Sequence, residues 1–510
     1  MHTLTLSLTT TSYDRKELER RLFAIWHVHN TLVRHARKQL GKLRRDKEYR
    51  ELLELYHQYK GKDAFAVQFR KIKDQLDGLR ETYGLTEAQM QKYAAVMGPR
   101  FKKLISSQQI QKEASRVYAG VEDVLFSDGK DLHFKKFTEQ STISGKSPTN
   151  GIRYYDKDHK DSYPKSVKPV FDHEIEYLGL HIRVKVPDAD YVKASLASQI
   201  SYCEIKRLEF NSGYRYYVIL YLKGPAPKMR EAGSEKCGVD PGVSTMALVA
   251  DSAVFLEELA PDVDKYTDRI EQLQQAIDAS TRASNPGNYN SDGTIKKGKK
   301  TWVNSKTCIR SKRKVRVLYR KRSAYIRQSH EKTINQVIRY CGAGTVNCEK
   351  MDYKALQKRA KQTKRKDTPS VVKNKKGEEK TVYKYEKKKR FGHSIQERAP
   401  SMFLSLLKNK VEQYGGTFQF VDTKTFKASQ YRHDTDTYKK EKLSTRSKIV
   451  SHRRVQRDLY SGFLIKNADK TLKHADREKC IREFEKFMKL HDAKIKEMKE
   501  KHISNPNFGF

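Results

Sequence analysis

Positive charge is the property of this sequence that restricts its folding most. The 510 residues include 105 Lys and Arg against 62 Asp and Glu, which gives a formal net charge of +43 at pH 7. Only 37% of the residues are hydrophobic, so the apolar side chains must be concentrated in local cores between wet, basic surfaces. A chain of this length is expected to hold about three domains of roughly 150 residues each.

Nucleic acid is the partner that this charge favours, because Lys and Arg displace the counterions of the phosphates. An anionic membrane is the alternative, but the sequence has no apolar run of about 18 residues, no lipidation signal and no N-terminal signal peptide. The six cysteines are scattered without any Cys-x-x-Cys, which argues against a disulfide framework and favours a reducing compartment. We therefore expect a nucleic-acid-binding protein without a membrane anchor, cytoplasmic and, in a prokaryote, associated with the nucleoid.

The first half of the chain changes from helical to β patterning. Residues 3–9 alternate as one strand, and apolar residues then recur at helical spacing, with Ser12 as the expected cap of the first helix. The helical pattern ends near residue 125. Residues 125–230 are rich in turns and strands, including a hairpin around Gly213, and are predicted to form a small β-barrel together with the first strand.

The second half combines short strands with basic helices. Between Lys296 and Arg339, 16 Lys and Arg stand against one acid while an apolar stripe persists. Most charge runs are solvated faces, but a nearly acid-free face beside an apolar stripe favours a helix lying along a phosphate backbone. The candidate contacts are Lys312, Arg313, Arg316 and Arg320.

Farther along, composition predicts one mobile segment and two helices. Residues 354–390 are Lys-rich and of low complexity, so we expect a mobile basic insertion. One helix is predicted from about Ser394 to Tyr414, ended by two glycines, and a charged amphipathic helix from 473 to 501.

Three carboxylates stand at positions that can carry chemistry. Asp240 lies in a strand before a Pro-Gly turn, Glu349 ends the strand TVNCE, and Asp458 opens an apolar helix. Each has an ordinary explanation: a turn residue, an exposed residue after a strand, and a helix N-cap. Together, in a chain this basic, they indicate a site where carboxylates converge and bind Mg²⁺ or Mn²⁺, because hard oxygen ligands select these ions.

The segments around these acids resemble a known family. GVDPGVSTMALV, VNCEKMDYKAL and VQRDLYSGFLI are similar to the three split motifs of the RuvC nuclease domain in TnpB proteins and compact type V CRISPR effectors. The similarity covers roughly residues 236–465. It implies a multidomain α/β protein in which an RNase H-like RuvC nuclease domain follows a wedge-type β-barrel and a helical recognition lobe.

The resemblance also implies a function and site residues. An RNA-guided DNA endonuclease pairs a guide RNA with its target beside a short flanking motif, and a two-metal RuvC site hydrolyses phosphodiester bonds. Asp240, Glu349 and Asp458 would be the catalytic, metal-binding acids, with two Mg²⁺ ions and Mn²⁺ as a possible substitute. Arg446 would correspond to an arginine near the site. The partners would be guide RNA and double-stranded target DNA, and the protein a monomer or homodimer.

In domain terms the resemblance predicts five parts. They are the first barrel strand (1–12), the helical recognition lobe (13–124), the rest of the barrel (125–230), the RuvC-like domain (231–470) and a charged C-terminal helix (471–510). The RuvC-like part includes a basic helical insertion at 263–340, the mobile segment at 354–390 and a degenerate zinc-ribbon region at 427–455. Relatives often hold zinc there, but this chain has no Cys between Cys348 and Cys480, so we predict no structural zinc.

Two other functions stay open from the sequence alone. One is a nuclease-independent RNA-guided DNA-binding repressor or transposon accessory protein, in which the three acids are structural relics. The other is a guide-free RNase H-like nuclease or transposase. Cleavage by the purified protein tests the first, and the identity of co-purifying RNA tests the second.

Overall fold

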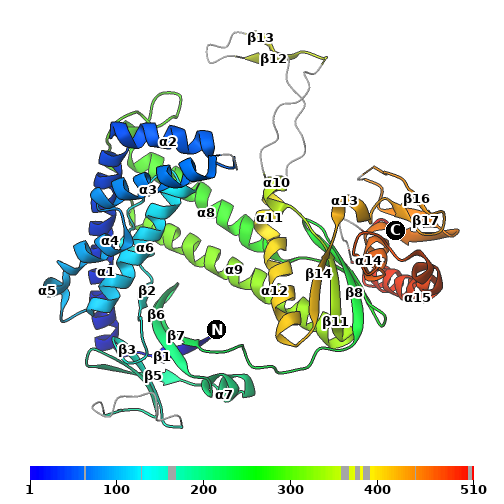
Figure 1. Cartoon of the computed structure of the whole chain (residues 1–510), viewed down its shortest axis with the longest axis horizontal. Helices are drawn as coiled ribbons and strands as arrows, with labels where there is room; N and C mark the ends of the chain where they lie inside the picture. Colours follow the sequence, from blue (N-terminus) through cyan, green and yellow to red (C-terminus); the bar gives the residue numbers. More distant parts are fainter. Residues whose placement is uncertain are drawn as a thin grey trace. The chain divides into compact units, whose positions relative to one another are not determined.

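The computed structural model describes residues 1–62, 65–127, 129–158, 168–357, 367–373, 379–382, 391–442, 444–503 and 508–510. Over these residues the chain forms two compact units, Met1–Pro227 and Lys228–Phe510. Each unit contains helices and a main β-sheet, so the protein belongs to the mixed α/β class (Figure 1). The boundary between the units lies next to the predicted domain boundary at 230/231.

The first unit begins with a strand and continues through six helices into a set of strands. Its helices are α1 (Ser12–Leu43), α2 (Lys47–Tyr59), α3 (Ala66–Thr82), α4 (Glu87–Ala95), α5 (Gly98–Phe101), α6 (Ser107–Phe126) and α7 (Asp190–Leu196). Its strands are β1 (His2–Thr9), β2 (Thr142–Ser144), β3 (Ile152–Asp156), β4 (His173–Tyr177), β5 (Leu180–Lys185), β6 (Ile200–Phe210) and β7 (Gly213–Leu222). Helix α7 interrupts a region for which the sequence predicted mainly strands.

The N-cap of helix α1 lies one residue before the predicted cap, Ser12. Its N-cap is Thr11, whose hydroxyl accepts a hydrogen bond from the backbone N–H of Asp14, while the Asp14 carboxylate accepts one from the N–H of Thr11. This reciprocal capping box satisfies two backbone N–H groups at once, which the predicted cap Ser12 does not do. The buried face of α1, with Leu18, Leu22 and other apolar residues, then joins the core of the unit.

The first unit's sheet is antiparallel and open. Its seven strands follow the order β2-β6-β7-β1-β5-β4-β3, and the N-terminal strand β1 pairs with both β7 and β5 at its centre. Among the described residues no hydrogen-bonded pairing joins the end strands β2 and β3. The prediction that β1 belongs with the later strands is therefore correct, but the expected closed barrel is not formed.

The second unit alternates strands with long helices. Its strands are β8 (Glu235–Pro241), β9 (Thr245–Val249), β10 (Val254–Glu258), β11 (Ala343–Glu349), β12 (Ser370–Lys373), β13 (Glu379–Val382), β14 (Thr417–Val421), β15 (Tyr431–Arg432), β16 (Thr437–Tyr438), β17 (Ser447–Val450) and β18 (Arg453–Gln456). Its helices are α8 (Val263–Ser284), α9 (Lys306–Cys341), α10 (Tyr353–Gln357), α11 (Gly392–Arg398), α12 (Pro400–Gln413), α13 (Thr423–Phe426), α14 (Arg457–Lys466) and α15 (Arg477–Glu500).

A five-stranded mixed sheet organises this unit. Its order is β10-β9-β8-β11-β14, with antiparallel pairs among β10, β9 and β8 and parallel pairs from β8 to β11 and from β11 to β14. One face packs against α9 and α12 through residues such as Val337 and Phe403. The other face packs against α14 and α15 through residues such as Phe463 and Phe487. Figure 1 shows β14, β11 and β8 side by side.

Two further expectations change in the second unit. The single helix predicted from Ser394 to Tyr414 is two helices, α11 and α12, because Ala399 adopts a left-handed backbone before Pro400. Proline disfavours helical geometry in the residue before it and cannot donate a hydrogen bond. Most of the segment 354–390 lies outside the described residues, so its mobility stays a prediction.

In the described ranges, no helix has both the length and the apolar character needed to span a bilayer.

Candidate active site

Asp240 and Glu349 lie on neighbouring parallel strands. Strands β8 and β11 pair with Val239 opposite Cys348, and Asp240 and Glu349 are the next residues along each. Val239 and Cys348 belong to the core on the α9 side, so the alternation of side chains turns the two acids toward the other face. There the two carboxyl groups are close enough for the charge of Glu349 to raise the pKa of Asp240.

Helix α14 brings Asp458 to the same face because two glycines let it approach β8 closely. A Cβ atom on Gly238 would lie 2.0 Å from the carbonyl oxygen of Gly462 and 2.2 Å from the backbone nitrogen of Lys466. Asp458 lies four residues before Gly462, so both residues are on the same face of α14. Asp240 lies two residues after Gly238, so both are on the same face of β8. The charge of Asp458 accordingly acts on Asp240.

Burial and repulsion change the titration of this group of Asp240, Glu349 and Asp458, hereafter the acid cluster. Burial is the largest cause of the raised pKa of Asp240, followed by the charges of Glu349 and Asp458. Burial also raises the pKa of Glu349, while its hydrogen bond to Asp240 lowers it. Carboxylates that repel one another in a buried place are stabilised by a proton or by a divalent cation.

Two cations border the acid cluster. Arg457 donates hydrogen bonds from Nε (3.1 Å) and Nη2 (3.0 Å) to Oδ1 of Asp458, and its Nη1 donates to the carbonyl of Thr445 at 3.0 Å. Lys448 is 8% exposed, and its ammonium group lies 4.3 Å from the centre of the Tyr460 ring. Burial lowers the pKa of Lys448 to about 8, an effect that the charge of Asp240 opposes. The acids therefore sit beside fixed positive charge, an arrangement suited to a phosphate.

The ordinary explanations for the three acids do not hold in this structure. Asp240 is a residue of β8 rather than of the following turn, and Glu349 is the half-buried end of β11 rather than an exposed residue. The N-cap of α14 is Gln456, whose side-chain oxygen accepts a hydrogen bond from the N–H of Leu459 at 2.6 Å, so Asp458 is not the cap. The acid cluster needs another explanation.

The acid cluster offers only carboxylate oxygens as ligands to a cation. The charges of Glu349 and Asp458 both raise the pKa of Asp240. The three acids do not form a compact trio, because the only described group of three His, Cys, Asp or Glu with ligand atoms all within 4.8 Å of one another lies elsewhere. Oxygen-only ligands of this kind fit Mg²⁺ or Mn²⁺.

Sequence reasoning missed the residues that support the acids. Spacing in the sequence does not mark any of these residues as part of a catalytic site: Gly238, Gly462, Arg457 and Lys448. The signal available for the glycines was their place: Gly238 stands two residues from Asp240, and Gly462 four from Asp458. Lys448 lies on β17, and nothing in its local sequence indicates that the fold buries it over Tyr460.

The predicted nucleic-acid contacts divide between one helix and one loop. Four of them lie on α9: Lys312, Arg313, Arg316 and Arg320. Spacing places Lys312, Arg316 and Arg320 on one face of that helix. Arg446 lies near the acid cluster because its carbonyl accepts a hydrogen bond of 2.9 Å from the backbone N–H of Arg457, the residue before Asp458.

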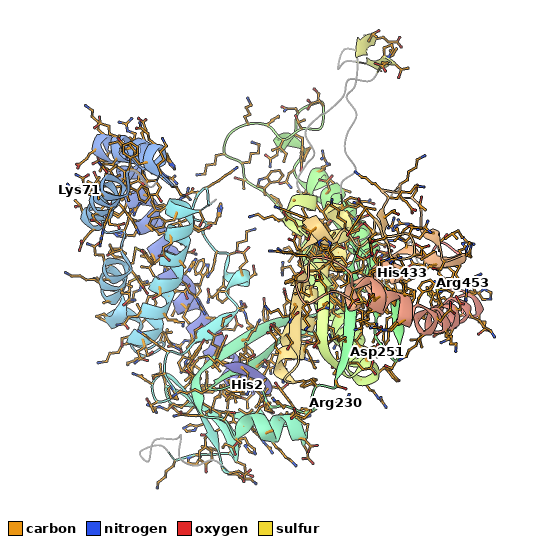
Figure 2. The ribbon with its side chains drawn as sticks, turned by 45° about the vertical axis from the view of Figure 1, so that its right-hand side comes forward. His2, Lys71, Arg230, Asp251, His433 and Arg453 are labelled. Atoms are coloured by element: carbon orange, nitrogen blue, oxygen red, sulfur yellow. The ribbon has the colours of Figure 1, made fainter. Side chains whose placement is uncertain are left out.

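Hydrogen bonds and aromatic packing hold the region 427–455, for which the sequence predicted no zinc. Asp434 accepts two hydrogen bonds from Arg432, at 3.1 and 2.7 Å, and one from the backbone N–H of Ser451 at 2.8 Å. His433, labelled in Figure 2, is 2% exposed and hydrogen-bonds through Nδ1 to the hydroxyl of Tyr460 at 2.7 Å. Its ring centre lies 4.8 Å from that of Phe484. This packing joins the region to α14 and α15.

No protein-family model matches the sequence, and no curated protein matches it either. Among solved structures, a Cas12f1–sgRNA–target DNA complex is similar over 91% of this chain and 98% of its own, with 11% identity and a TM-score of 0.44. A CRISPR–Cas12f ternary complex is similar over 92% of this chain and 99% of its own, with 11% identity and a TM-score of 0.26. The chain is therefore similar in structure to these two Cas12f complexes over most of its length. Because both TM-scores lie below 0.5, we base the proposed function on the residues of the site.

Proposed function

We propose that this protein is an RNA-guided DNA endonuclease whose nuclease centre is the acid cluster. The observation that carries the proposal is the convergence of Asp240, Glu349 and Asp458 from two strands and a helix onto one buried face. Nothing in the core requires three carboxylates there, and burying them without a cation is unfavourable. Metal-dependent phosphodiester chemistry gives such a cluster a purpose.

The order of the sheet supports an RNase H-like architecture for the second unit. Three antiparallel strands are followed by two parallel ones, with an acid on the first strand in sequence and another at the end of the fourth. The third acid stands in the first turn of a helix packed on the same sheet. These positions agree with those that the resemblance to RuvC domains implies, which supports the proposal.

The chain's own groups suggest how such a site would work. Asp240 and its two neighbours would hold two Mg²⁺ ions, or Mn²⁺, which when bound supply an activated water and stabilise the leaving oxygen. The Arg457 guanidinium fixes the Asp458 carboxylate through two hydrogen bonds and so keeps one acid in place. Lys448 and Arg457 add positive charge that attracts the scissile phosphate toward the carboxylates.

The charge of the whole chain supports nucleic-acid partners. A net charge of +43 favours binding to polyanions such as a guide RNA, a guide–target heteroduplex and displaced DNA. Lys312, Arg313, Arg316 and Arg320 on α9, and Arg446 beside the acid cluster, are the proposed contacts with phosphate. Sequence recognition would then come from base pairing with the guide, as in other RNA-guided systems.

Co-purifying RNA gives the most direct test of the guide. The protein is purified with its bound RNA, the RNA is sequenced, and the complex is offered plasmids that carry the matching target beside a randomised flank. We expect one enriched RNA species and linearised plasmids that share a flanking motif. Random RNA fragments, with cleavage that ignores the target sequence, would instead indicate a guide-free nuclease, and a bound but intact plasmid would indicate a repressor.

A further inference from the structure

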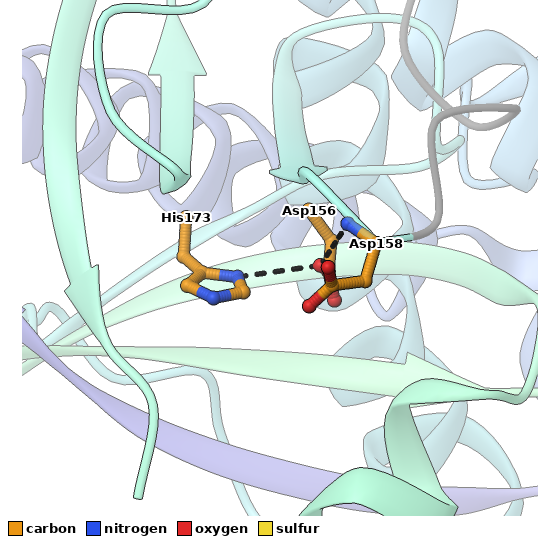
Figure 3. A group of neighbouring side chains, drawn as sticks. All are labelled: Asp156, Asp158 and His173. Carbon is orange, nitrogen blue, oxygen red and sulfur yellow. Dashed lines mark hydrogen bonds and ion pairs between the residues drawn. The ribbon is translucent and has the colours of Figure 1, made fainter.

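A second group of potential metal ligands lies in the first unit, at the end of strands β3 and β4. It consists of Asp156, Asp158 and His173, whose ligand atoms all lie within 4.8 Å of one another (Figure 3). We call it the hairpin triad. Neither its place in the fold nor its residue types connect it with the acid cluster.

The pairing of the two strands creates this group. Strands β3 and β4 are antiparallel, with Tyr154 opposite Ile175 and Asp156 opposite His173. Asp156 is the last residue of β3, is 3% exposed, and lies on the same face of the strand as buried Tyr154. Asp158 is exposed, and its backbone N–H donates a hydrogen bond of 2.9 Å to Oδ1 of Asp156. A nearly buried carboxylate, an imidazole and an exposed carboxylate thus meet where the strands end.

Two buried polar atoms at this place have no hydrogen-bond partner in the described part of the chain. One is Nδ1 of His173, which lies 3.4 Å from Oδ1 of Asp156. The other is the hydroxyl of Tyr154, a residue that is 2% exposed. Tyr154 stands two residues before Asp156 on the same buried face of β3, so the side chains of both residues lie on one face of the hairpin. Buried polar groups without partners are uncommon, and a bound ion or water is a frequent reason for them.

The spacing of the ligand atoms agrees with a tetrahedral ion. Zinc binds histidine nitrogen at about 2.0–2.1 Å and carboxylate oxygen at about 2.0–2.2 Å, which places two ligands of a tetrahedron roughly 3.4 Å apart. His173 Nδ1 and Asp156 Oδ1 have this separation. It is long for a hydrogen bond to an imidazole nitrogen, whereas it is the ordinary separation of two ligands on one ion.

We propose that the hairpin triad binds one divalent transition-metal ion of the Zn²⁺ or Co²⁺ class. Imidazole nitrogen favours these ions over Mg²⁺, and two carboxylates with one imidazole leave a fourth position for water. That water would give the Tyr154 hydroxyl the partner it lacks. The ion would link the edge strand β3 to β4 at the point where the chain leaves the sheet. The expectation of no structural zinc rested on missing cysteines, and this site uses none.

Cobalt titration of the full-length protein tests the proposal. After dialysis against a chelator, the protein is titrated with Co²⁺, and the visible absorption that marks tetrahedral cobalt is recorded. We expect one equivalent to bind with this spectrum, and we expect His173→Ala and Asp158→Asn to weaken binding at least tenfold. Asp158 is exposed, so the second variant keeps the fold even if the first does not.

Two control variants separate this site from other ligands. His181→Ala removes a histidine of the same sheet that pairs with Glu174 instead, and Asp240→Ala disables the acid cluster. Both should show the tetrahedral Co²⁺ spectrum with the affinity of the wild type. The proposal is wrong if the wild type gives no tetrahedral spectrum, or if either His173→Ala or Asp158→Asn keeps wild-type affinity. In that event His173 and Asp156 form only an ion pair.

Discussion

Replacing Gly238 with alanine should separate the helix that carries Asp458 from the strand that carries Asp240. The new Cβ atom would lie 2.0 Å from the carbonyl oxygen of Gly462, whereas ordinary contact needs about 3.4 Å or more, so α14 must retreat by more than roughly 1 Å. The neighbouring atom is backbone, which cannot rotate away. Overpacking of this kind costs about 1–3 kcal/mol of folding free energy. A displacement of about 1 Å in a reacting group can lower the rate on the order of 100-fold.

The assay compares three properties of Gly238→Ala with those of the wild type. We expect target binding close to normal, a melting temperature lower by roughly 2–10 °C, and cleavage reduced on the order of 100-fold. Gly78→Ala is the matched control, because Gly78 lies in helix α3 and an added Cβ would meet nothing within 4 Å. That variant should be as stable as the wild type or slightly more so. Wild-type cleavage by Gly238→Ala would refute the claim that close packing of α14 positions Asp458.

Three more predictions concern the second unit. Burial lowers the pKa of His433 from 6.5 to about 4, so the unfolded chain takes up this proton at a higher pH than the folded chain does. The free energy of unfolding should therefore fall as the pH drops from about 6.5 to about 4. Over this range, chemical denaturation of His433→Asn should show a loss of stability that is smaller than that of the wild type by up to about 3 kcal/mol. Asp434→Ala leaves a guanidinium and a backbone N–H without their acceptor, so the same method should show that it lowers the free energy of unfolding by about 2–4 kcal/mol. The control Glu412→Ala removes an exposed ion pair and should lower it by less than about 1 kcal/mol. Replacing Lys312 and Arg316 with glutamine should reduce the slope of log affinity against log salt for RNA by roughly 1.5; an unchanged slope would mean that α9 does not contact phosphate.

Local patterns in the sequence predicted much of the second unit. Hydrophobic periodicity predicted three elements of the site: the strand containing Asp240, the strand ending at Glu349 and the helix with Asp458 in its first turn. Their convergence followed from the resemblance to RuvC domains and not from the pattern, because the order of β8, β11 and β14 is set by contacts far apart in the sequence. The glycine contact that fixes α14 is likewise a property of two segments that meet only in the fold.

The first unit shows where sequence reasoning ended. Alternation predicted β1 and the hairpin of β6 and β7, but closure of a barrel depends on pairing between end strands, which no local pattern encodes. The hairpin triad escaped notice for a similar reason. Asp156 and Asp158 are close in sequence, yet His173 joins them only through the register of β3 with β4. In α12, by contrast, the signal was present and overlooked, since Pro400 marks the break.

The acid cluster as a metal-dependent nuclease centre is tested most directly by removing the Asp240 carboxylate. Asp240→Ala and wild-type ribonucleoprotein are compared for target binding and for plasmid cleavage in Mg²⁺ and in Mn²⁺, with Glu412→Ala as an exposed control. We predict that Asp240→Ala binds the target as the wild type does and that its cleavage falls below detection with either ion. Cleavage by Asp240→Ala at the wild-type rate would contradict the assignment of the nuclease centre.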